Sequence, residues 1–281
     1  MKTVSVIIPT FDRASMVCRA LSSVLHQNFD PAEIEIIVVD DGSRDDTEER
    51  IAPFRKHISY IRHAENQGVS AARNTGIRHS SAPLVAFLDS DDYWLPEKLQ
   101  TQVAFFRRQP ECVACQTQEI WIRRGRRVNP RKKHLKPSGD VFIPSLRLCL
   151  VSPSAVMLKR SLLDEVGLFD ESLPACEDYD LWLRISSRYP IHLIDEYLLV
   201  KEGGHSDQLS TRIGGLDRYR IQSLVNLIEK EDLKDEYLLA ALKELRRKCR
   251  IYGKGCLKRG KTNEADYYFD LPDRLERACK R

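Results

Sequence analysis

The chain has 281 residues, of which 42% are apolar and 31% charged, and its formal net charge is +4. This length suffices for one large domain with an appendage or for two modest domains of a globular protein. The small net charge gives no support to nucleic-acid binding, and no apolar run approaches the roughly 18 residues of a membrane span. The N-terminus enters an apolar run without a secretory signal, so we expect a cytoplasmic protein.

Short strands and helices alternate through the first 110 residues. Apolar runs predict strands at residues 4–8, 34–39, 58–61 and 84–88. Helical spacing of apolar residues predicts helices at residues 16–25, 45–54, 68–78 and 96–106. Strands alternating with helices indicate right-handed crossover units, so we expect an α/β fold with a mainly parallel central sheet.

The pattern changes after residue 110. Strands are predicted at residues 113–122, 155–158, 191–194 and 197–200, and a helix at 177–188. Between residues 123 and 136 lies a basic stretch, which we interpret as a loop that binds an acidic acceptor or a membrane surface, or as a solvated loop. From Leu216 onward the chain is predicted to be helical, and such a short helical tail should pack on the rest of the chain or on a partner.

The eight cysteines are expected to be reduced thiols that act as small apolar side chains. Cys112 and Cys115 have the spacing of zinc ligands. No second such pair follows them, so we interpret this spacing as strand alternation.

The sequence Asp89-Ser90-Asp91 follows the predicted strand 84–88 directly. In an open α/β sheet, ligands bind at the carboxyl ends of the strands. Carboxylates at such a place suit Mg²⁺ or Mn²⁺ with phosphate oxygens completing the coordination shell, which indicates a nucleoside diphosphate. The alternative is a polar turn that caps the next helix.

Four further polar segments stand where a predicted strand ends or a helix begins. They are residues 9–12, 40–43, 66–74 and 177–178. Loops at strand ends are where α/β enzymes assemble their sites. We therefore expect all five segments to contribute to one site.

These segments resemble the motifs of family 2 glycosyltransferases. The resemblance rests on VSVIIPTFD at 4–12, VVDDGS at 38–43, GVSAARN at 68–74, FLDSDD at 87–92, and GLFDE at 167–171 with EDYDL at 177–181. It covers about residues 3–210 and implies a GT-A nucleotide-binding fold and inverting transfer of a sugar from a nucleotide diphosphate. The implied division is a GT-A domain at 1–210, with a nucleotide-sugar half at 1–110 and an acceptor half at 111–210, followed by a helical tail at 211–281.

The resemblance assigns the donor site to named residues. Pro9, Thr10, Phe11 and Asp12 would line the nucleoside pocket. Phe11 replaces the tyrosine common in this family, so stacking on a base is kept while a phenol hydrogen bond is lost. Asp41 would accept a hydrogen bond from the base, although its sequence context also suits a plain tight turn.

Further residues would hold the phosphates and the metal. Arg73 would neutralise a phosphate or a carboxylate, and Ser90 would lie beside the nucleotide. Asp89 would approach the ribose or join the metal shell, and Asp91 would be the direct metal ligand. His205, which follows two glycines, would complete the shell around Mg²⁺ or Mn²⁺.

Asp178 would be the general base that takes the proton from the acceptor hydroxyl. Alternatively, Asp178 has only a structural role, as an acidic residue in the first turn of a helix, where the helix dipole favours negative charge. Family habit favours a UDP-sugar as donor and a carbohydrate or glycolipid as acceptor, with contact at the inner face of a membrane. One alternative function is nucleotidyl transfer, which would favour a glycine-rich basic loop after the first strand. Another is a non-catalytic module that binds a nucleotide-sugar.

Overall fold

The computed structural model describes residues 1–204 and 213–279. Its first half contains four parallel strands, as predicted, in the order β3-β2-β1-β4. They are β1 (Val4–Thr10), β2 (Ile34–Asp40), β3 (Ser59–Arg62) and β4 (Leu84–Phe87). The carboxyl ends of these strands therefore meet at one edge, which is where the predicted donor residues lie.

Beyond β4 the same sheet continues in the order β8-β6-β9-β5, with β7 paired to β6. These strands are β5 (Tyr93–Trp94), β6 (Ala114–Arg123), β7 (Arg126–Val128), β8 (Val156–Lys159) and β9 (His192–Gly203). Only β6 and β9 pair in parallel within this half of the described sheet. The prediction of separate strands at 191–194 and 197–200 was wrong, because β9 is continuous and its pairing with β6 absorbs two register shifts.

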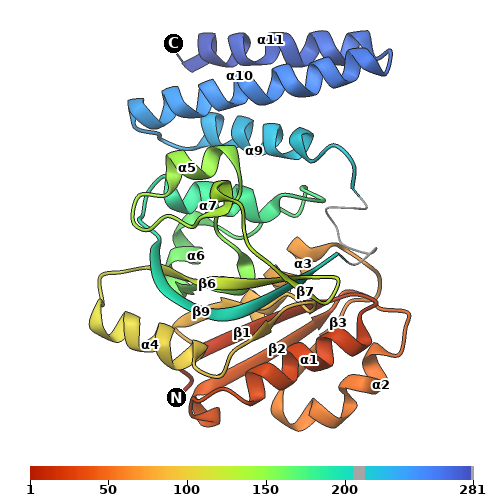
Figure 1. Ribbon diagram of the computed structural model, residues 1–281, viewed down its shortest axis with the longest axis vertical. Coiled ribbons are helices and arrows are strands. Elements are labelled where there is room, and N and C mark those ends of the chain that lie inside the picture. Colours follow the sequence, from red (N-terminus) through yellow and green to blue (C-terminus); the bar gives the residue numbers. More distant parts are fainter. Residues whose placement is uncertain (205–212, 280–281) are drawn as a thin grey trace.

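Helices cover both faces of the sheet (Figure 1). α1 (Ala14–Leu25) and α4 (Lys98–Arg108) share one hydrophobic cluster with alternate residues of β1 such as Val6. α3 (Val69–His79), α6 (Arg160–Val166) and α7 (Glu177–Ser186) share the cluster on the opposite face. The period-two alternation of a strand thus supplies two cores.

Two parts of the helical pattern differ from prediction. The helix expected at 45–54 is the shorter α2 (Thr47–Ile51), followed by a 3₁₀ segment (Ala52–His57) that contains Pro53. α5 (Phe142–Arg147) and α6 were not predicted. Each spans only about two turns, too few for a helical period to show in the sequence.

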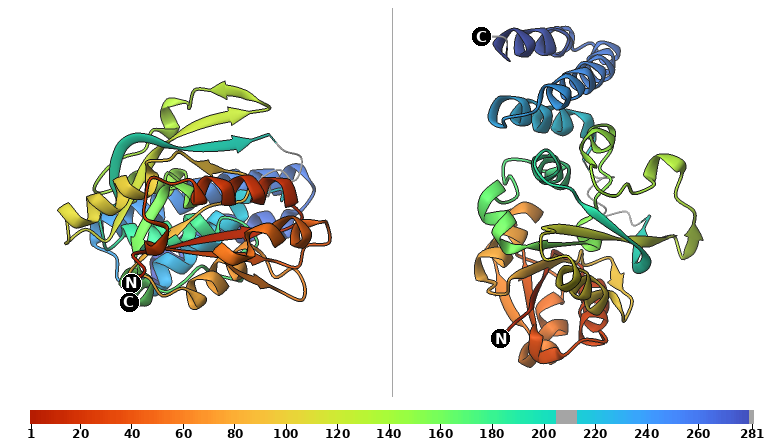
Figure 2. Two further views of the ribbon diagram at one scale, coloured as in Figure 1. Left: turned by 90° about the horizontal axis from the view of Figure 1, so that it is seen from below. Right: turned by 90° about the vertical axis from the view of Figure 1, so that its left-hand side faces the viewer.

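Three helices follow the sheet domain: α9 (Leu216–Lys230), α10 (Asp235–Lys258) and α11 (Thr262–Cys279). Figure 2 shows them stacked at the end of the molecule away from β1 and β2. A third hydrophobic cluster joins Phe142 of α5 and Tyr179 of α7 to residues of all three helices. This confirms the expectation that the helical tail packs on the rest of the chain.

Candidate functional site

The loops after β1 and β2 are tied to each other. The backbone N–H of Asp12 donates to Ser43 Oγ at 2.9 Å, and the N–H of Arg44 donates to Asp12 Oδ1 at 2.7 Å. Gly42 has a φ of +78°, and a Cβ there would lie 2.8 Å from the backbone carbon of Glu65. Glycine is required at this position on both counts, so the turn is fixed by the DDGS sequence.

Thr10 ends β1 beside this turn and is buried. Its Oγ1 has no hydrogen-bond partner among the described residues. Buried hydroxyl groups are normally bonded, so this one has capacity for a ligand atom. Phe11, next in the chain, is partly exposed, which leaves its ring accessible for stacking.

Asp40 and Asp41 have different surroundings. Asp40 is fully buried and accepts hydrogen bonds from the backbone of Ser43 and from the Tyr60 hydroxyl, so it holds the turn together. Asp41 accepts from His63 Nδ1 at 2.7 Å and, in the segment entering α3, from two backbone N–H groups, those of Gln67 at 2.9 Å and Gly68 at 2.8 Å. A carboxylate accepts about four hydrogen bonds, so Asp41 keeps room for one more.

Arg73 of α3 connects two motifs that lie far apart in the sequence. Its guanidinium is buried, and it donates from Nη2 to Asp89 at 2.7 Å and from Nη1 to Glu177 at 2.7 Å. Burial would lower the pKa of Arg73, but the two carboxylates raise it above its usual value. The turn after β4 and the first turn of α7 therefore share one cation.

The turn after β4 is a set of interacting carboxylates. Burial would raise the pKa of Asp89, but the charge of Arg73 holds it below its usual value. Burial and then the charge of Asp89 raise the pKa of Asp91, against the effect of Arg13, whose Nη1 lies 3.1 Å from Asp91 Oδ2. Asp92 is buried and accepts from the Ser154 hydroxyl at 2.7 Å, which gives it a structural role.

Asp178 lies in the first turn of α7, one residue after Glu177. Cys176, which precedes the helix, has a φ of +64°, an uncommon conformation for a residue with a side chain. Asp178 accepts a hydrogen bond from the Tyr179 N–H at 2.7 Å, and the Cys149 thiol lies 3.6 Å from Asp178 Oδ2. The carboxylate is only partly exposed and keeps acceptor capacity for an incoming hydroxyl group.

Lys201 of β9 belongs to the candidate site, although it was not predicted from the sequence. Its Nζ donates to Ser152 Oγ at 3.2 Å. Burial alone would lower the pKa of Lys201, but surrounding carboxylates raise it; in order of effect they are Glu119, Asp92, Asp89 and Asp178. The charges of Asp89 and Asp178 thus both act on the same ammonium group. A single lysine in an apolar strand gives no sequence signal of this role.

A second ion pair lies beside Lys201. Lys136 Nζ is 3.0 Å from Glu119 Oε2, and both side chains are buried. Burial would raise the pKa of Glu119, but Lys136 and then Lys201 lower it to about 2. The pKa of Lys136 is lowered as well, because burial outweighs its attraction to Glu119. The lowered pKa of Glu119 favours its charged form, whereas the lowered pKa of Lys136 favours its neutral form. The distance of 3.0 Å between them supports a charged pair at neutral pH.

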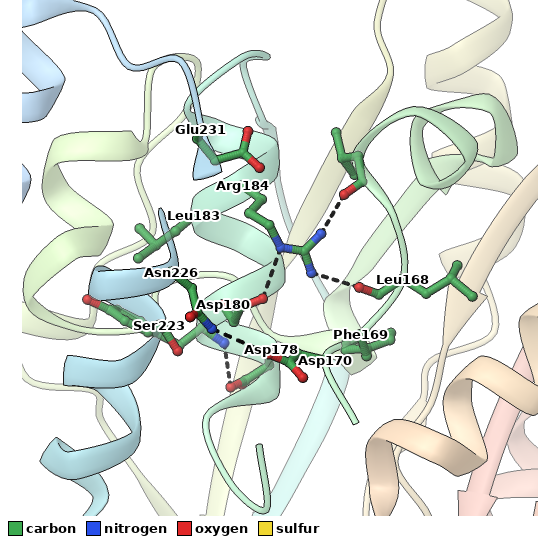
Figure 3. Close-up of polar contacts among 12 residues, drawn as sticks. Leu168, Phe169, Asp170, Asp178, Asp180, Leu183, Arg184, Ser223, Asn226 and Glu231 are labelled. Atoms are coloured by element: carbon green, nitrogen blue, oxygen red, sulfur yellow. Dashed lines mark hydrogen bonds and ion pairs between the residues drawn. The ribbon is translucent and has the colours of Figure 1, made fainter. Parts of the chain in front are cut away.

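The α7 helix is held in place by a network around Arg184, drawn in Figure 3. Arg184 donates to Asp180 of its own helix at 2.9 Å and to the carbonyl oxygen of Leu168 at 2.7 Å. On the α3 side, Asn74 donates to the carbonyl oxygen of Phe169 at 2.9 Å. These contacts fix the segment 167–171 and with it the start of α7.

The residues present fit a divalent cation of the hard, oxygen-binding kind. Asp89 is near enough to Asp91 for its charge to raise the pKa of Asp91. A protein site for Mg²⁺ or Mn²⁺ commonly supplies one or two carboxylates while substrate phosphates supply the rest. Among residues 1–204 and 213–279, however, no group of three or more His, Cys, Asp or Glu side chains forms a ready-made metal site.

The predicted donor residues therefore gather at one edge of the sheet, and Asp178 lies next to them through the Arg73 contact with Glu177. Ser90 is buried within the same turn. His205 lies outside the described residues. No helix of the described chain is long and apolar enough to cross a bilayer.

Comparison with known proteins identifies relatives of the chain. The model of the family described as Glycosyl transferase family 2 matches residues 5–167. An uncharacterized glycosyltransferase of Rickettsia felis is 31% identical over 221 residues, 75% of this chain and 35% of that protein, so the match spans about a third of the relative's length. A protein of Escherichia coli named UDP-Glc:α-D-GlcNAc-diphosphoundecaprenol β-1,3-glucosyltransferase WfgD is 31% identical over 65% of this chain and 69% of its own.

Solved structures share the fold. The structure of Staphylococcus aureus TarS 1–349 in complex with UDP-GlcNAc has a TM-score of 0.76 at 21% identity and covers 97% of this chain and 79% of its own. The mannosyltransferase PcManGT of Pyrobaculum calidifontis, in complex with GDP-Man and Mn²⁺, has a TM-score of 0.64 at 18% identity over 94% of this chain and 84% of its own.

Proposed function

The chain belongs to glycosyl transferase family 2, and from that premise we propose that its site transfers a sugar from a nucleoside diphosphate, preferably UDP, to a hydroxyl group of a carbohydrate or glycolipid. The main support for the proposal is the pair of ion pairs that Arg73 forms with Asp89 and Glu177, which we call the Arg73 clamp. It brings Asp89, at the tip of the donor-side strand β4, together with Glu177, the neighbour of Asp178. The E. coli relative, whose name specifies a UDP-Glc donor and a lipid-linked acceptor, supports this choice of substrates.

The proposed donor site lies at the ends of β1, β2 and β4. Pro9, Thr10, Phe11 and Asp12 would contact the nucleoside, and Asp41 would accept from the base. Ser90 and Arg73 would lie near the diphosphate. Asp89 and Asp91 would hold a divalent cation, with His205 as the further ligand. A bound Mg²⁺ or Mn²⁺ supplies positive charge that stabilises the departing diphosphate.

The proposed chemistry is a single displacement with inversion. Asp178 takes the proton of the acceptor hydroxyl group while that oxygen forms a bond to the anomeric carbon. The bond from this carbon to the β-phosphate oxygen breaks, and the nucleoside diphosphate leaves with the electron pair. Attack from the face opposite the leaving group inverts the configuration, as in inverting glycoside hydrolysis.

We also propose the domain division expected from the sequence, with residues 1–210 as a GT-A domain and 211–281 as a helical tail. Within the first of these, residues 1–110 would bind the donor and 111–210 the acceptor. The helical tail would support α7, because the two share a hydrophobic cluster. We place the protein in the cytoplasm at the inner face of a membrane, where a lipid-linked acceptor is found.

The test compares two carboxylates of α7. Nucleotide-sugars are screened with a GlcNAc-diphospho-lipid analogue, and products are followed by mass spectrometry and their anomeric configuration by NMR. Asp178→Asn should lower kcat by about 10²–10⁴-fold, since it removes the base. Asp180→Asn, two residues along, should lower the melting temperature through its contact with Arg184 while keeping most of kcat. Equal losses of kcat in both variants, or a product of retained configuration, would contradict the proposal.

A further inference from the structure

Part of the basic stretch is a β-hairpin and not the loop expected from the sequence. β6 and β7 are joined by Arg124 and Gly125, whose φ angles are +52° and +72°. Two successive residues with positive φ are typical of a type I′ turn, which usually takes Asn-Gly or Gly-Gly. Arginine is a costly residue at the first of these positions. The backbone therefore presents Arg124 at the tip despite a conformational penalty.

The hairpin also places like charges opposite each other. Arg123 pairs directly with Arg126 across the two strands. Directly opposed like charges destabilise an antiparallel pair. The turn and the cross-strand pair both oppose folding, so folding does not account for these arginines.

The cationic surface continues beyond the hairpin. Seven of its cationic side chains are exposed, and none forms an ion pair with another residue of the described chain; they are Arg123, Arg124, Arg126, Arg127, Arg131, Lys132 and Lys133. We call these residues the basic arm. Leu135, two residues past the arm, is 62% exposed. Figure 2 shows the β6–β7 hairpin projecting from the body of the molecule.

The root of the basic arm is fixed to the candidate site. Lys136 forms the buried ion pair with Glu119, and Trp121 contacts the His134 ring at 5.1 Å between centroids. Trp121 pairs with Lys201 of β9, and residues paired across strands lie on the same face of a sheet. Arg123, two residues after Trp121, lies on that face as well. The arm thus extends the sheet face that carries Lys201.

We propose that the basic arm binds the anionic phospholipid surface of a bilayer and so holds the site next to a lipid-linked acceptor. Seven spread cations exceed what a single diphosphate would need, whereas clusters of four to eight Lys or Arg beside a membrane suit anionic headgroups. Leu135 adds an apolar contact at the interface. Lipid binding does not depend on the proposed catalytic chemistry, and only the benefit to a lipid-linked acceptor rests on it.

The test is co-sedimentation of the full chain with vesicles of phosphatidylcholine, with and without about one third phosphatidylglycerol. The protein should bind only the anionic vesicles, and added salt should release it because salt screens charge. The combined change Arg126→Gln, Arg127→Gln, Lys132→Gln and Lys133→Gln should weaken partitioning at least about tenfold. A matched variant with four exposed α10 cations removed, Lys243→Gln, Arg250→Gln, Lys254→Gln and Lys258→Gln, should bind like the parent protein.

Equal binding to neutral vesicles, unchanged binding of the arm variant, or an equal loss in the α10 variant would overturn the proposal. Displacement from vesicles by millimolar pyrophosphate at constant ionic strength would assign the arm to a soluble diphosphate instead. Asp178→Asn should sediment like the parent protein whatever its activity. Loss of transfer to a soluble acceptor in the arm variant, with vesicle binding kept, would place the arm in the acceptor site and contradict membrane docking.

Discussion

At the scale of single residues, the candidate site consists of carboxylates whose charges are compensated by buried cations. Arg73 lies between Asp89 and Glu177, and the charges of Asp89, Asp92, Asp178 and Glu119 raise the pKa of Lys201. Buried carboxylates cluster only where cations compensate them. In the proposed site, Asp91 would face the donor and Asp178 the acceptor hydroxyl group.

Glu119 gives a prediction with a defined pH dependence. Its pKa is lowered to about 2 in the folded chain, so its stabilisation is present above its ordinary pKa and is lost as the pH falls through that range. Glu119→Gln should lower the free energy of unfolding by the order of 3 kcal/mol at pH 7, as measured by urea denaturation.

The difference between this variant and the parent chain should shrink steadily between about pH 4.5 and 2. Glu196→Gln, which changes an exposed carboxylate of β9, should stay within about 0.5 kcal/mol. A Glu119→Gln difference that is the same at pH 7 and pH 3 would show that its charge is not responsible.

At the scale of elements, α3 is the part that brings the two halves of the site together. It packs closely on β1, where a Cβ at position 76 would lie 2.4 Å from Ile7 Cγ2. From that position it directs Arg73 to β4 and α7, and Asn74 to the segment 167–171. The spacing between α3 and the sheet therefore sets the geometry of the clamp.

Gly76→Ala should destabilise the protein by about 1–3 kcal/mol, because it overpacks this contact. Gly255→Ala, in the interior of α10, is the control. Its new methyl group would meet only the mobile end of Arg259, so the helical preference of alanine should stabilise by about 0.5–1 kcal/mol. Thermal unfolding of both variants measures the contrast, and two shifts of the same sign would refute it.

The sequence predicted β1 to β4 and α1, α3 and α4, because each of these elements comes from one continuous apolar run or helical stripe. It located the candidate residues through their places at strand ends. It could not show the Arg73–Glu177 contact, which joins residues 104 positions apart. The nearness of Lys201 to Glu119 was missed for the same reason, since it depends on the pairing of β6 with β9.

At the scale of the whole molecule, the helical tail and the sheet domain share a core. Leu224 of α9 is fully buried in the cluster that includes Tyr179 and Leu183 of α7. We therefore expect the chain to unfold in one cooperative transition. Leu224→Ala should lower the free energy of unfolding by about 2–5 kcal/mol and shift that single transition. Calorimetry that resolved two transitions, with only one moved by the substitution, would show that the tail is an independent unit.

The most direct measurement is calorimetric titration of UDP into the parent chain, Asp91→Asn and Asp178→Asn, each with Mn²⁺ and with chelator. We expect Mn²⁺-dependent binding to the parent chain, at least about tenfold weaker binding to Asp91→Asn, and a dissociation constant within about twofold of the parent for Asp178→Asn. Binding that ignores both Mn²⁺ and the Asp91 substitution, or that is lost equally in both variants, would contradict a donor site at the tip of β4 with a separate base on α7.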